Sequence, residues 1–402
     1  MTDIAIIGAG HAGGKLYQNL KNNNHKGKIF IFGDEKYSPY ERPSLSKGFL
    51  SGEKKIEDFT LKIDNKDKSQ NKNIFLNNKI KKIDIENKKI IDANDIKYSF
   101  DKIVFATGGS PKKIDINSLE NVFYLRNIDD CLEIKSHLLS NNNIVIIGAG
   151  YIGLEIASTI RKLFKNKSIT IIESSSNILG RNCNDDLRDI ILKFHKENKI
   201  KFYFNSKVKN FLGQKKIQEI VLSNDEKINC DLLIVGIGIT PNIKLIANTS
   251  IADDKGITVD EYSESKIKNV YAMGDVAFFK SNFFNKHVRE ESWNNAERQS
   301  LLLSQNIVGK KLPYDEIPWF WTDQYEKNIQ ILGDINEFDS SIERNYDDKR
   351  LTKFFFRNNK ITGIFSINHG KDITISRKIM KKNLDLDIDK LKDINFNLKS
   401  FI

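Results

Sequence analysis

One local pattern occurs twice in the sequence, and it limits the possible folds more than any other feature. Each copy has a short apolar run, a glycine-rich turn of the form G-x-G-x-x-G and a helical stretch. The turns are Gly8-Ala9-Gly10-His11-Ala12-Gly13, after the run 4–7, and Gly148-Ala149-Gly150-Tyr151-Ile152-Gly153, after the run 143–147. One such turn also occurs in ordinary strand-turn-helix corners. Two complete units predict two dinucleotide-binding sites.

The three glycines of each motif have separate expected roles. The first, Gly8 or Gly148, permits the tight turn, and the second, Gly10 or Gly150, lets the backbone approach a pyrophosphate. The third lets the helix lie close to the strand; these residues are Gly13 and Gly153. The pyrophosphate would then meet free N–H groups at the start of the helix.

Each unit continues into a second strand that ends at a carboxylate. The strand 28–32 leads to Asp34 and Glu35, and we expect Glu35, with Asp34 as the alternative, to accept hydrogen bonds from the ribose hydroxyls. The strand 168–172 leads to Glu173, twenty residues after Gly153. No arginine follows Glu173 immediately to hold a 2′-phosphate. The pattern therefore favours NADH, while use of NADPH stays open.

Two dinucleotide sites in one chain indicate electron transfer. The economical interpretation is one tightly held flavin, FAD, and one exchangeable nicotinamide, NADH.

Composition narrows the class of protein. A chain of 402 residues suggests two or three domains. The net charge of +11 could attract an acidic partner, but the lysines are scattered among Asn and Ile residues rather than gathered in an arginine-rich stripe. We expect no nucleic-acid partner.

The three cysteines, Cys131, Cys183 and Cys230, lie far apart in the sequence. They form neither a C-x-x-C pair nor a metal-ligand spacing, so we expect buried hydrophobic roles and no metal site. Met1 leads directly into an apolar strand, and the longest apolar stretch, 144–157, is too short for a bilayer. We therefore expect a soluble, cytoplasmic protein with no membrane partner.

Four further segments resemble the ferredoxin reductase group of flavoproteins with two dinucleotide-binding domains, and the match covers nearly the whole chain. They are P-Y-E-R-P-S-L-S-K at 39–47, F-A-T-G-G at 105–109, Y-A-M-G-D-V at 271–276 and P-W-F-W-T-D-Q at 318–324. Ser44 departs from the group, in which a second proline is usual at that position.

The resemblance implies roles for charged residues. It assigns Arg42 to the flavin phosphate or ring, and Lys47 to the reactive edge of the isoalloxazine. A cation at that edge would favour the anionic reduced flavin. Glu155 would pair with Lys47 and help to position the nicotinamide. The alternative for Arg42 and Lys47 is a solvated surface charge.

The resemblance also assigns smaller contacts. The expected flavin contacts are Ala106, Thr107, Gly108, Arg126, Asp275, Val276 and Trp321, with Arg126 aligned less securely. Gly236 and Gly238 fit the strand that closes the NAD domain. A helix cap is the rival role for Asp275, and a core position is the rival for Trp321.

The resemblance implies hydride transfer from NADH to FAD, then single electrons to an acidic two-iron ferredoxin or rubredoxin, as the reductase component of an oxygenase system. Thioredoxin reductases and related peroxidases need cysteines beside the flavin, and none precedes Cys131 here. The alternatives are an NADH oxidase or disulfide-type reductase, and a flavin-containing redox sensor that binds NADH without turnover.

We therefore predict an α/β chain with two doubly wound, Rossmann-like domains and a C-terminal α+β domain. The expected FAD domain is 1–110 with 245–320, the NAD domain is 111–244, and the C-terminal domain is 321–402. In the last we expect strands at 328–333, 351–357 and 361–367 and a helix at 372–382. The chain would be a monomer or a homodimer.

Overall fold

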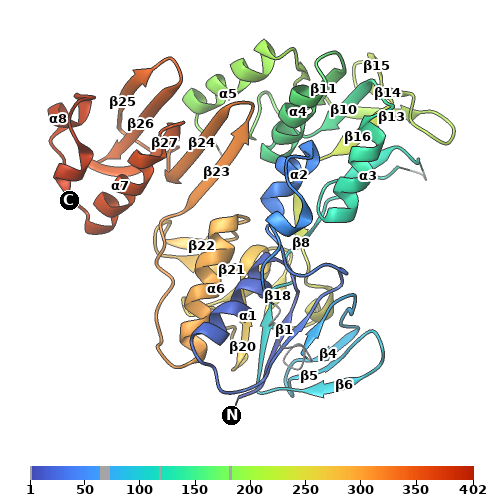
Figure 1. Cartoon of the computed structure of the whole chain (residues 1–402), viewed down its shortest axis with the longest axis vertical. Coiled ribbons are helices and arrows are strands. Elements are labelled where there is room, and N and C mark those ends of the chain that lie inside the picture. Colours follow the sequence, from blue (N-terminus) through green and yellow to red (C-terminus); the bar gives the residue numbers. More distant parts are fainter. Residues whose placement is uncertain (1, 64–72, 117–118, 181–182) are drawn as a thin grey trace. The chain divides into compact units, whose positions relative to one another are not determined.

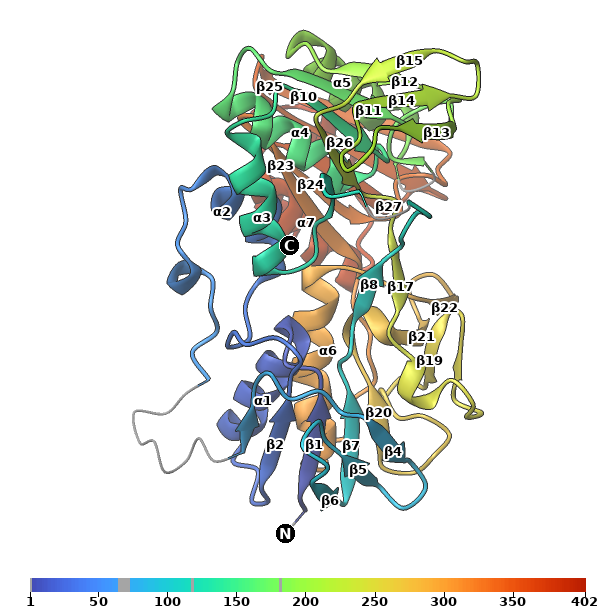
Figure 2. The same cartoon turned by 90° about the vertical axis from the view of Figure 1, so that its right-hand side faces the viewer.

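The computed structural model describes residues 2–63, 73–116, 119–180 and 183–402, and the chain divides into two compact units. The first unit comprises Met1–Pro43, Lys55–Ser110 and Ile239–Pro318. The second comprises Ser44–Lys54, Pro111–Gly238 and Trp319–Ile402. Figures 1 and 2 show their elements.

A parallel sheet of five strands, in the order β20-β7-β1-β2-β3, forms the centre of the first unit. Its strands are β1 (Ile4–Ile7), β2 (Ile29–Phe32), β3 (Ile74–Phe75), β7 (Lys102–Phe105) and β20 (Val270–Ala272). The sequences IAII, IFIF and KIVF are apolar without alternation, because both faces of these strands are covered.

The two faces of this sheet are covered by different kinds of element. Helices α1 (His11–Asn22) and α6 (Trp293–Ile307) lie on one face (Figure 2). Leu16 of α1 and Leu303 of α6 belong to the same buried cluster as Ile6. Small sheets cover the other face, where Ile90 and Phe279 pack near Phe105. These are β4 (Lys82–Asp84), β5 (Lys89–Ile91) and β6 (Lys97–Ser99), and β18 (Ala252–Asp253), β19 (Gly256–Val259), β21 (Ala277–Ser281) and β22 (Lys286–Val288).

The second unit repeats the parallel design with the order β12-β11-β10-β16-β9. Its strands are β9 (Val122–Tyr124), β10 (Asn143–Ile147), β11 (Ser168–Ile172), β12 (Lys201–Tyr203) and β16 (Leu232–Val235). Its helices are α2 (Gly48–Ser51), α3 (Ile128–Leu138), α4 (Tyr151–Leu163) and α5 (Asp185–Glu197). An antiparallel sheet of β13 (Val208–Leu212), β14 (Glu219–Leu222) and β15 (Lys227–Asn229) packs Ile220 and Leu222 against Val145 and Leu233.

The C-terminal part of the second unit is an antiparallel sheet in the order β23-β24-β27-β26-β25. The strands are β23 (Trp319–Gln324), β24 (Lys327–Gly333), β25 (Ser340–Asp347), β26 (Arg350–Arg357) and β27 (Lys360–Ile367), followed by α7 (Gly370–Lys382) and α8 (Ile388–Lys392). Strand β23 packs on α4. The three predicted strands and the predicted helix of this region are β24, β26, β27 and α7.

The predicted fold class is confirmed. The division into FAD, NAD and C-terminal domains stays a prediction, although the structure groups residues 44–54 with the second unit rather than with the glycine motif at 8–13. Among the described helices, none combines the length and the apolarity that a membrane span requires.

Candidate dinucleotide sites

The two glycine turns have the same steric design. A Cβ atom at Gly8 would lie 2.2 Å from the Ala106 carbonyl oxygen, and one at Gly148 would lie 2.4 Å from that of Gly236. Both residues also have positive φ angles, 113° and 104°. Any larger residue would therefore open the corner between strand and helix.

In both units the third glycine is crowded and the second is not. A Cβ at Gly13 would meet the Gly8 carbonyl oxygen at 2.0 Å, and one at Gly153 would meet that of Gly148 at 2.2 Å. A Cβ at Gly10 would have only Arg42 Nη2 nearby, at an ordinary contact distance of 3.5 Å, and one at Gly150 would find no heavy atom within 4 Å. The third glycine brings the helix close, and the second leaves space in front of the turn, as a pyrophosphate requires.

Helices α1 and α4 begin directly after these open positions. Gly10 and Gly150 are the N-cap residues, and neither helix has an acidic residue in its first turn or a side chain that caps its N-terminal N–H groups. Both helix starts can therefore donate hydrogen bonds to an anion.

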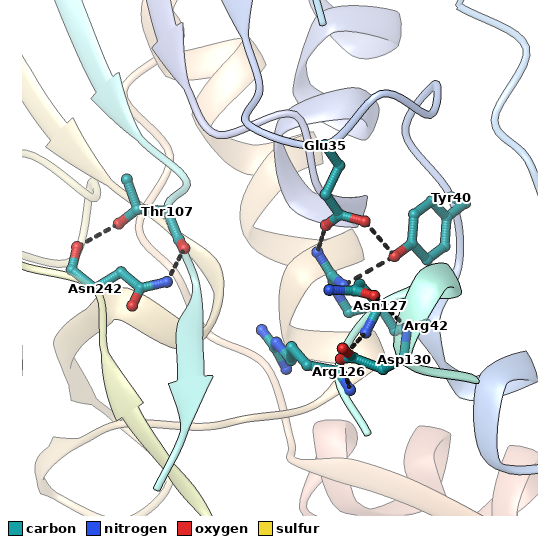
Figure 3. A network of polar contacts seen from close by, with 8 residues as sticks. All are labelled: Glu35, Tyr40, Arg42, Thr107, Arg126, Asn127, Asp130 and Asn242. Atoms are coloured by element: carbon teal, nitrogen blue, oxygen red, sulfur yellow. Dashed lines mark hydrogen bonds and ion pairs between the residues drawn. The ribbon is translucent and has the colours of Figure 1, made fainter. Parts of the chain in front are cut away.

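In the first unit, Glu35, Tyr40 and Arg42 form a closed network (Figure 3). The Arg42 Nη2 atom lies 2.7 Å from Glu35 Oε1, and the Tyr40 hydroxyl donates to Glu35 Oε2 at 2.6 Å. Arg42 Nη1 also donates to the Tyr40 hydroxyl at 3.1 Å. Glu35 is thereby held after β2, whereas the alternative residue Asp34 is exposed.

Arg42 also faces the glycine turn. Its Nη2 atom lies 3.5 Å from the position that a Cβ at Gly10 would take. Burial lowers the pKa of Arg42. The interactions with Tyr40, Glu35 and Asp275 raise this pKa by more than burial lowers it, so the pKa lies above its usual value. The Arg42 guanidinium, paired with Glu35, therefore stays charged beside the open glycine.

The other predicted flavin contacts of the first unit lie on two loops. Thr107 follows β7, and its hydroxyl donates to the Asn242 carbonyl at 2.8 Å, while the Asn242 side chain donates back to the Thr107 carbonyl at 2.9 Å (Figure 3). Asp275 lies in the short turn Gly274–Val276, whose N-cap residue is Met273 rather than Asp275. The Gly274 N–H donates to buried Gln299 at 2.7 Å.

In the second unit, the glycine turn opens into a cavity of about 690 Å³. Glu173 lines it and is fixed at both oxygens: Oε2 accepts from the Ala149 N–H at 2.8 Å, and Oε1 accepts from the Ser175 N–H at 2.9 Å. The predicted residues that line the cavity are Gly148, Gly150, Glu173, Gly236 and Gly238. Lys207 and Lys209 line the same cavity and were not predicted.

Lys47 and Glu155 form a largely buried ion pair in the second unit. The Lys47 Nζ atom lies 2.7 Å from Glu155 Oε2, and Glu155 is only 2% exposed. The Ser46 hydroxyl donates to the same oxygen at 2.5 Å, and the Thr322 hydroxyl donates to Oε1 at 2.6 Å. Lys47 is therefore not a solvated surface charge.

The remaining predicted flavin contacts of the second unit are Arg126 and Trp321. Arg126 lies just before α3, and its backbone N–H donates to the Asp130 side chain, in the first turn of that helix, at 2.8 Å (Figure 3). Trp321 lies on β23, stacks on Trp319 with ring centroids 5.3 Å apart and donates to Asp323 at 3.2 Å. Contact of either residue with flavin stays a prediction.

Sequence reasoning did not single out several supporting residues. Tyr40, Ser46 and Thr322 lie inside segments that carried the resemblance, so their positions were marked although their contacts were not. Ser175 had no comparable signal. Two parallel sheets, each with an open glycine turn and a fixed carboxylate after the next strand, define an oxidoreductase of the type that binds two dinucleotides.

Comparison with known proteins identifies the family. Residues 2–300 match the pyridine nucleotide-disulphide oxidoreductase family, and residues 319–402 match the reductase C-terminal family. Rhodocoxin reductase of Rhodococcus erythropolis is 30% identical, with 98% of this chain and 93% of that protein covered. Putidaredoxin reductase of Pseudomonas putida is 28% identical, with 100% and 96% covered.

A solved structure of the covalent putidaredoxin reductase–putidaredoxin complex matches with a TM-score of 0.92 and 27% identity, covering 100% of this chain and 98% of the other. This chain belongs to the pyridine nucleotide-disulphide oxidoreductase family. It is a flavoprotein oxidoreductase that uses FAD and NAD(H).

Proposed function

We propose that the chain is an NADH-dependent reductase that delivers electrons to a small iron–sulfur protein, a two-iron ferredoxin or rubredoxin, as the reductase component of an oxygenase system. Bound FAD would supply the redox chemistry, since it accepts a hydride and releases electrons singly. The observation that carries the proposal is the buried Lys47–Glu155 pair in a chain with two open dinucleotide turns.

In this proposal the first unit holds FAD. Gly8, Gly10 and Gly13 admit the pyrophosphate, Arg42 neutralises it, and Glu35 accepts from the ribose. The turn at Ala106, Thr107 and Gly108 and the turn at Asp275 and Val276 contribute further contacts. Arg126 and Trp321 are further proposed FAD contacts.

The second unit would hold NADH through Gly148, Gly150, Gly153, Gly236 and Gly238, with Glu173 on the ribose diol. Lys47 would place positive charge toward the reduced flavin, and Glu155 would orient Lys47 and the nicotinamide. No side chain needs to donate or remove a proton during hydride transfer.

The state of the cysteines separates this proposal from a disulfide-type reductase. Cys131, Cys183 and Cys230 are all free thiols and all buried. Burial raises the pKa of each to about 12, so none is a ready nucleophile at neutral pH. The electrons therefore have no thiol route, and direct transfer to an outside acceptor remains.

The names of several relatives support the choice of acceptor. One is the ferredoxin–NAD(+) reductase component of the p-cumate 2,3-dioxygenase system of Pseudomonas putida, 28% identical over 99% of this chain, and another is a rubredoxin–NAD(+) reductase. Cytoplasmic location is part of the same proposal.

An anaerobic mixing experiment tests the proposal. The purified protein is mixed with NADH, and bleaching of the flavin absorbance is followed before a two-iron ferredoxin or rubredoxin is added. We expect fast bleaching and then reoxidation by one of these acceptors. Bleaching that persists until oxygen enters would instead favour the oxidase or sensor alternatives.

A further inference from the structure

A chain of buried hydrogen bonds leads from Glu155 into the C-terminal sheet. The Thr322 hydroxyl bonds Glu155 Oε1 at 2.6 Å, and Gln324 Nε2 lies 3.1 Å from the Thr322 Oγ1 atom. Gln324 Oε1 lies 2.8 Å from His195 Nε2, and the Tyr325 hydroxyl lies 3.0 Å from His195 Nδ1. We call Thr322, Gln324, His195 and Tyr325 the donor chain.

The chemistry of these groups fixes the direction of every bond. The Glu155 carboxylate paired with Lys47 can only accept, so Thr322 must donate to it and accept from the Gln324 amide N–H. The Gln324 carbonyl is then left to accept from His195 Nε2–H. His195 Nδ1 must accept from the Tyr325 hydroxyl if the imidazole is neutral.

The surroundings of His195 favour that neutral form. Its side chain is 0% exposed, and burial lowers its pKa to about 4, opposed only by the bond to Gln324. All four donors therefore point along one line toward a single buried carboxylate, and hydrogen bonds aligned in this way polarise and strengthen one another.

Two features indicate that the donor chain positions the Glu155 carboxylate and does not conduct a proton. Gln324 offers separate donor and acceptor groups and cannot pass a proton in its ordinary amide form. Thr322 and Gln324 also lie two residues apart on β23, so both side chains project from the same face of the strand that packs on α4.

We propose that Thr322, Gln324 and His195 are positioning residues that hold the Glu155 carboxylate against Lys47 and thereby support hydride transfer from NADH. The inference rests on the proposed roles of Lys47 and Glu155. It adds that three buried residues of the C-terminal sheet and α5, outside the dinucleotide turns, set the orientation and charge of that pair.

The test compares Thr322→Val with Thr352→Val. Both threonines are 0% exposed and lie on strands of the same sheet, but the Thr352 hydroxyl bonds Ser366 at 3.3 Å and has no place in the donor chain. The flavin-reduction rate is measured anaerobically by stopped flow at increasing NADH concentrations and over a range of pH. Thermal melting and FAD content are recorded for each variant.

Thr322→Val should lower the saturating reduction rate about tenfold, because a hydrogen bond to a charged group is lost. The NADH dissociation constant should stay unchanged, and the pH at which the rate falls on the acid side should rise. Among the described residues, Lys47 and Tyr151 are the ionisable groups with a recorded interaction with Glu155. Burial and Cys183 raise the pKa of Tyr151, so its hydroxyl keeps its proton at neutral pH. Thr322→Ser should restore rate and profile, and Thr352→Val should match the wild type in both.

Gln324→Met and Tyr325→Phe extend the test if Thr322→Val does not fold. We expect about a threefold loss for Gln324→Met and less for Tyr325→Phe, since the effect should fade along the chain. If both variants matched Thr352→Val in rate and pH profile, the inference would be overturned. A wild-type protein that NADH does not reduce would overturn the proposed function itself.

Discussion

At the scale of single residues, Glu173 should decide between the two nicotinamide cofactors. Its oxygens are fixed by the Ala149 and Ser175 N–H groups, and a 2′-phosphate placed on this carboxylate would be repelled. Glu173→Gln removes that charge, while Lys207 and Lys209 remain in the same cavity. We expect KM for NADH to rise about tenfold and the preference over NADPH to shrink.

Steady-state kinetics with each cofactor and a small uncharged acceptor measure this change. Glu219→Gln is the matched control, because Glu219 lies on β14 and pairs with Lys227 rather than lining the cavity. An unchanged cofactor preference in Glu173→Gln would show that the ribose is recognised elsewhere.

The cysteines give a second prediction at this scale. Because burial raises the pKa of Cys131, Cys183 and Cys230 to about 12, alkylation with an uncharged reagent at pH 8 should leave the native protein unmodified, both before and after reduction by NADH. Mass spectrometry should show three labelled thiols only after denaturation. Labelling that appears with NADH and abolishes turnover would support a disulfide-type cycle.

The same thiols affect stability at high pH. Above about pH 9 the unfolded state loses thiol protons that the folded state keeps, so these groups make the free energy of unfolding fall as pH rises. Below that pH their contribution is constant.

The role of a single residue could be predicted from the sequence where the backbone at that position tolerates only one residue type. The crowded glycines at 8, 13, 148 and 153 are such positions, because backbone atoms fill the space of a Cβ. His195 was not predicted: it lies in the polar stretch F-H-K-E-N, and its partner Gln324 is 129 residues away. Local patterns carry no information about such a contact.

At the scale of elements, Arg344 ties the C-terminal segment to the sheet. It lies on β25, is 2% exposed and donates to the carbonyls of Leu391, Ile394 and Phe396 at 2.9–3.0 Å. Lysine cannot reproduce this fork, so Arg344→Lys should lower the free energy of unfolding by about 2 kcal/mol or more.

Denaturant unfolding and limited proteolysis of the C-terminal segment check this effect. Arg357→Lys is the control on the neighbouring strand, since Arg357 forms an exposed pair with Glu337. The control should leave the free energy of unfolding nearly unchanged, because an exposed ion pair contributes little to it. Equal losses in both variants would contradict the anchoring role.

Elements differed in how well the sequence predicted them. The central strands β1, β10 and β11 match their predicted bounds, because buried parallel strands are short, apolar and followed by a defined turn. Strands of the covering sheets, such as β4 (K-I-D) and β6 (K-Y-S), were not predicted. They are three residues long and largely polar, so their structure depends on packing rather than on pattern.

At the scale of the whole molecule, the net charge of +11 bears on the partner. We expect the basic surface to steer an acidic ferredoxin toward the protein, since complementary charges raise association rates and salt screens them. The kcat/KM for ferredoxin reduction should therefore fall about tenfold or more between about 0.05 and 0.5 M salt.

The rate with a small uncharged acceptor should stay nearly constant over the same range, because its approach involves no charge pairing. The two acceptors are compared at saturating NADH, so that any effect of salt on cofactor binding cancels. Parallel losses for both acceptors would show that salt acts on the reductase itself, whereas a loss confined to ferredoxin would place the effect in the encounter of the two proteins.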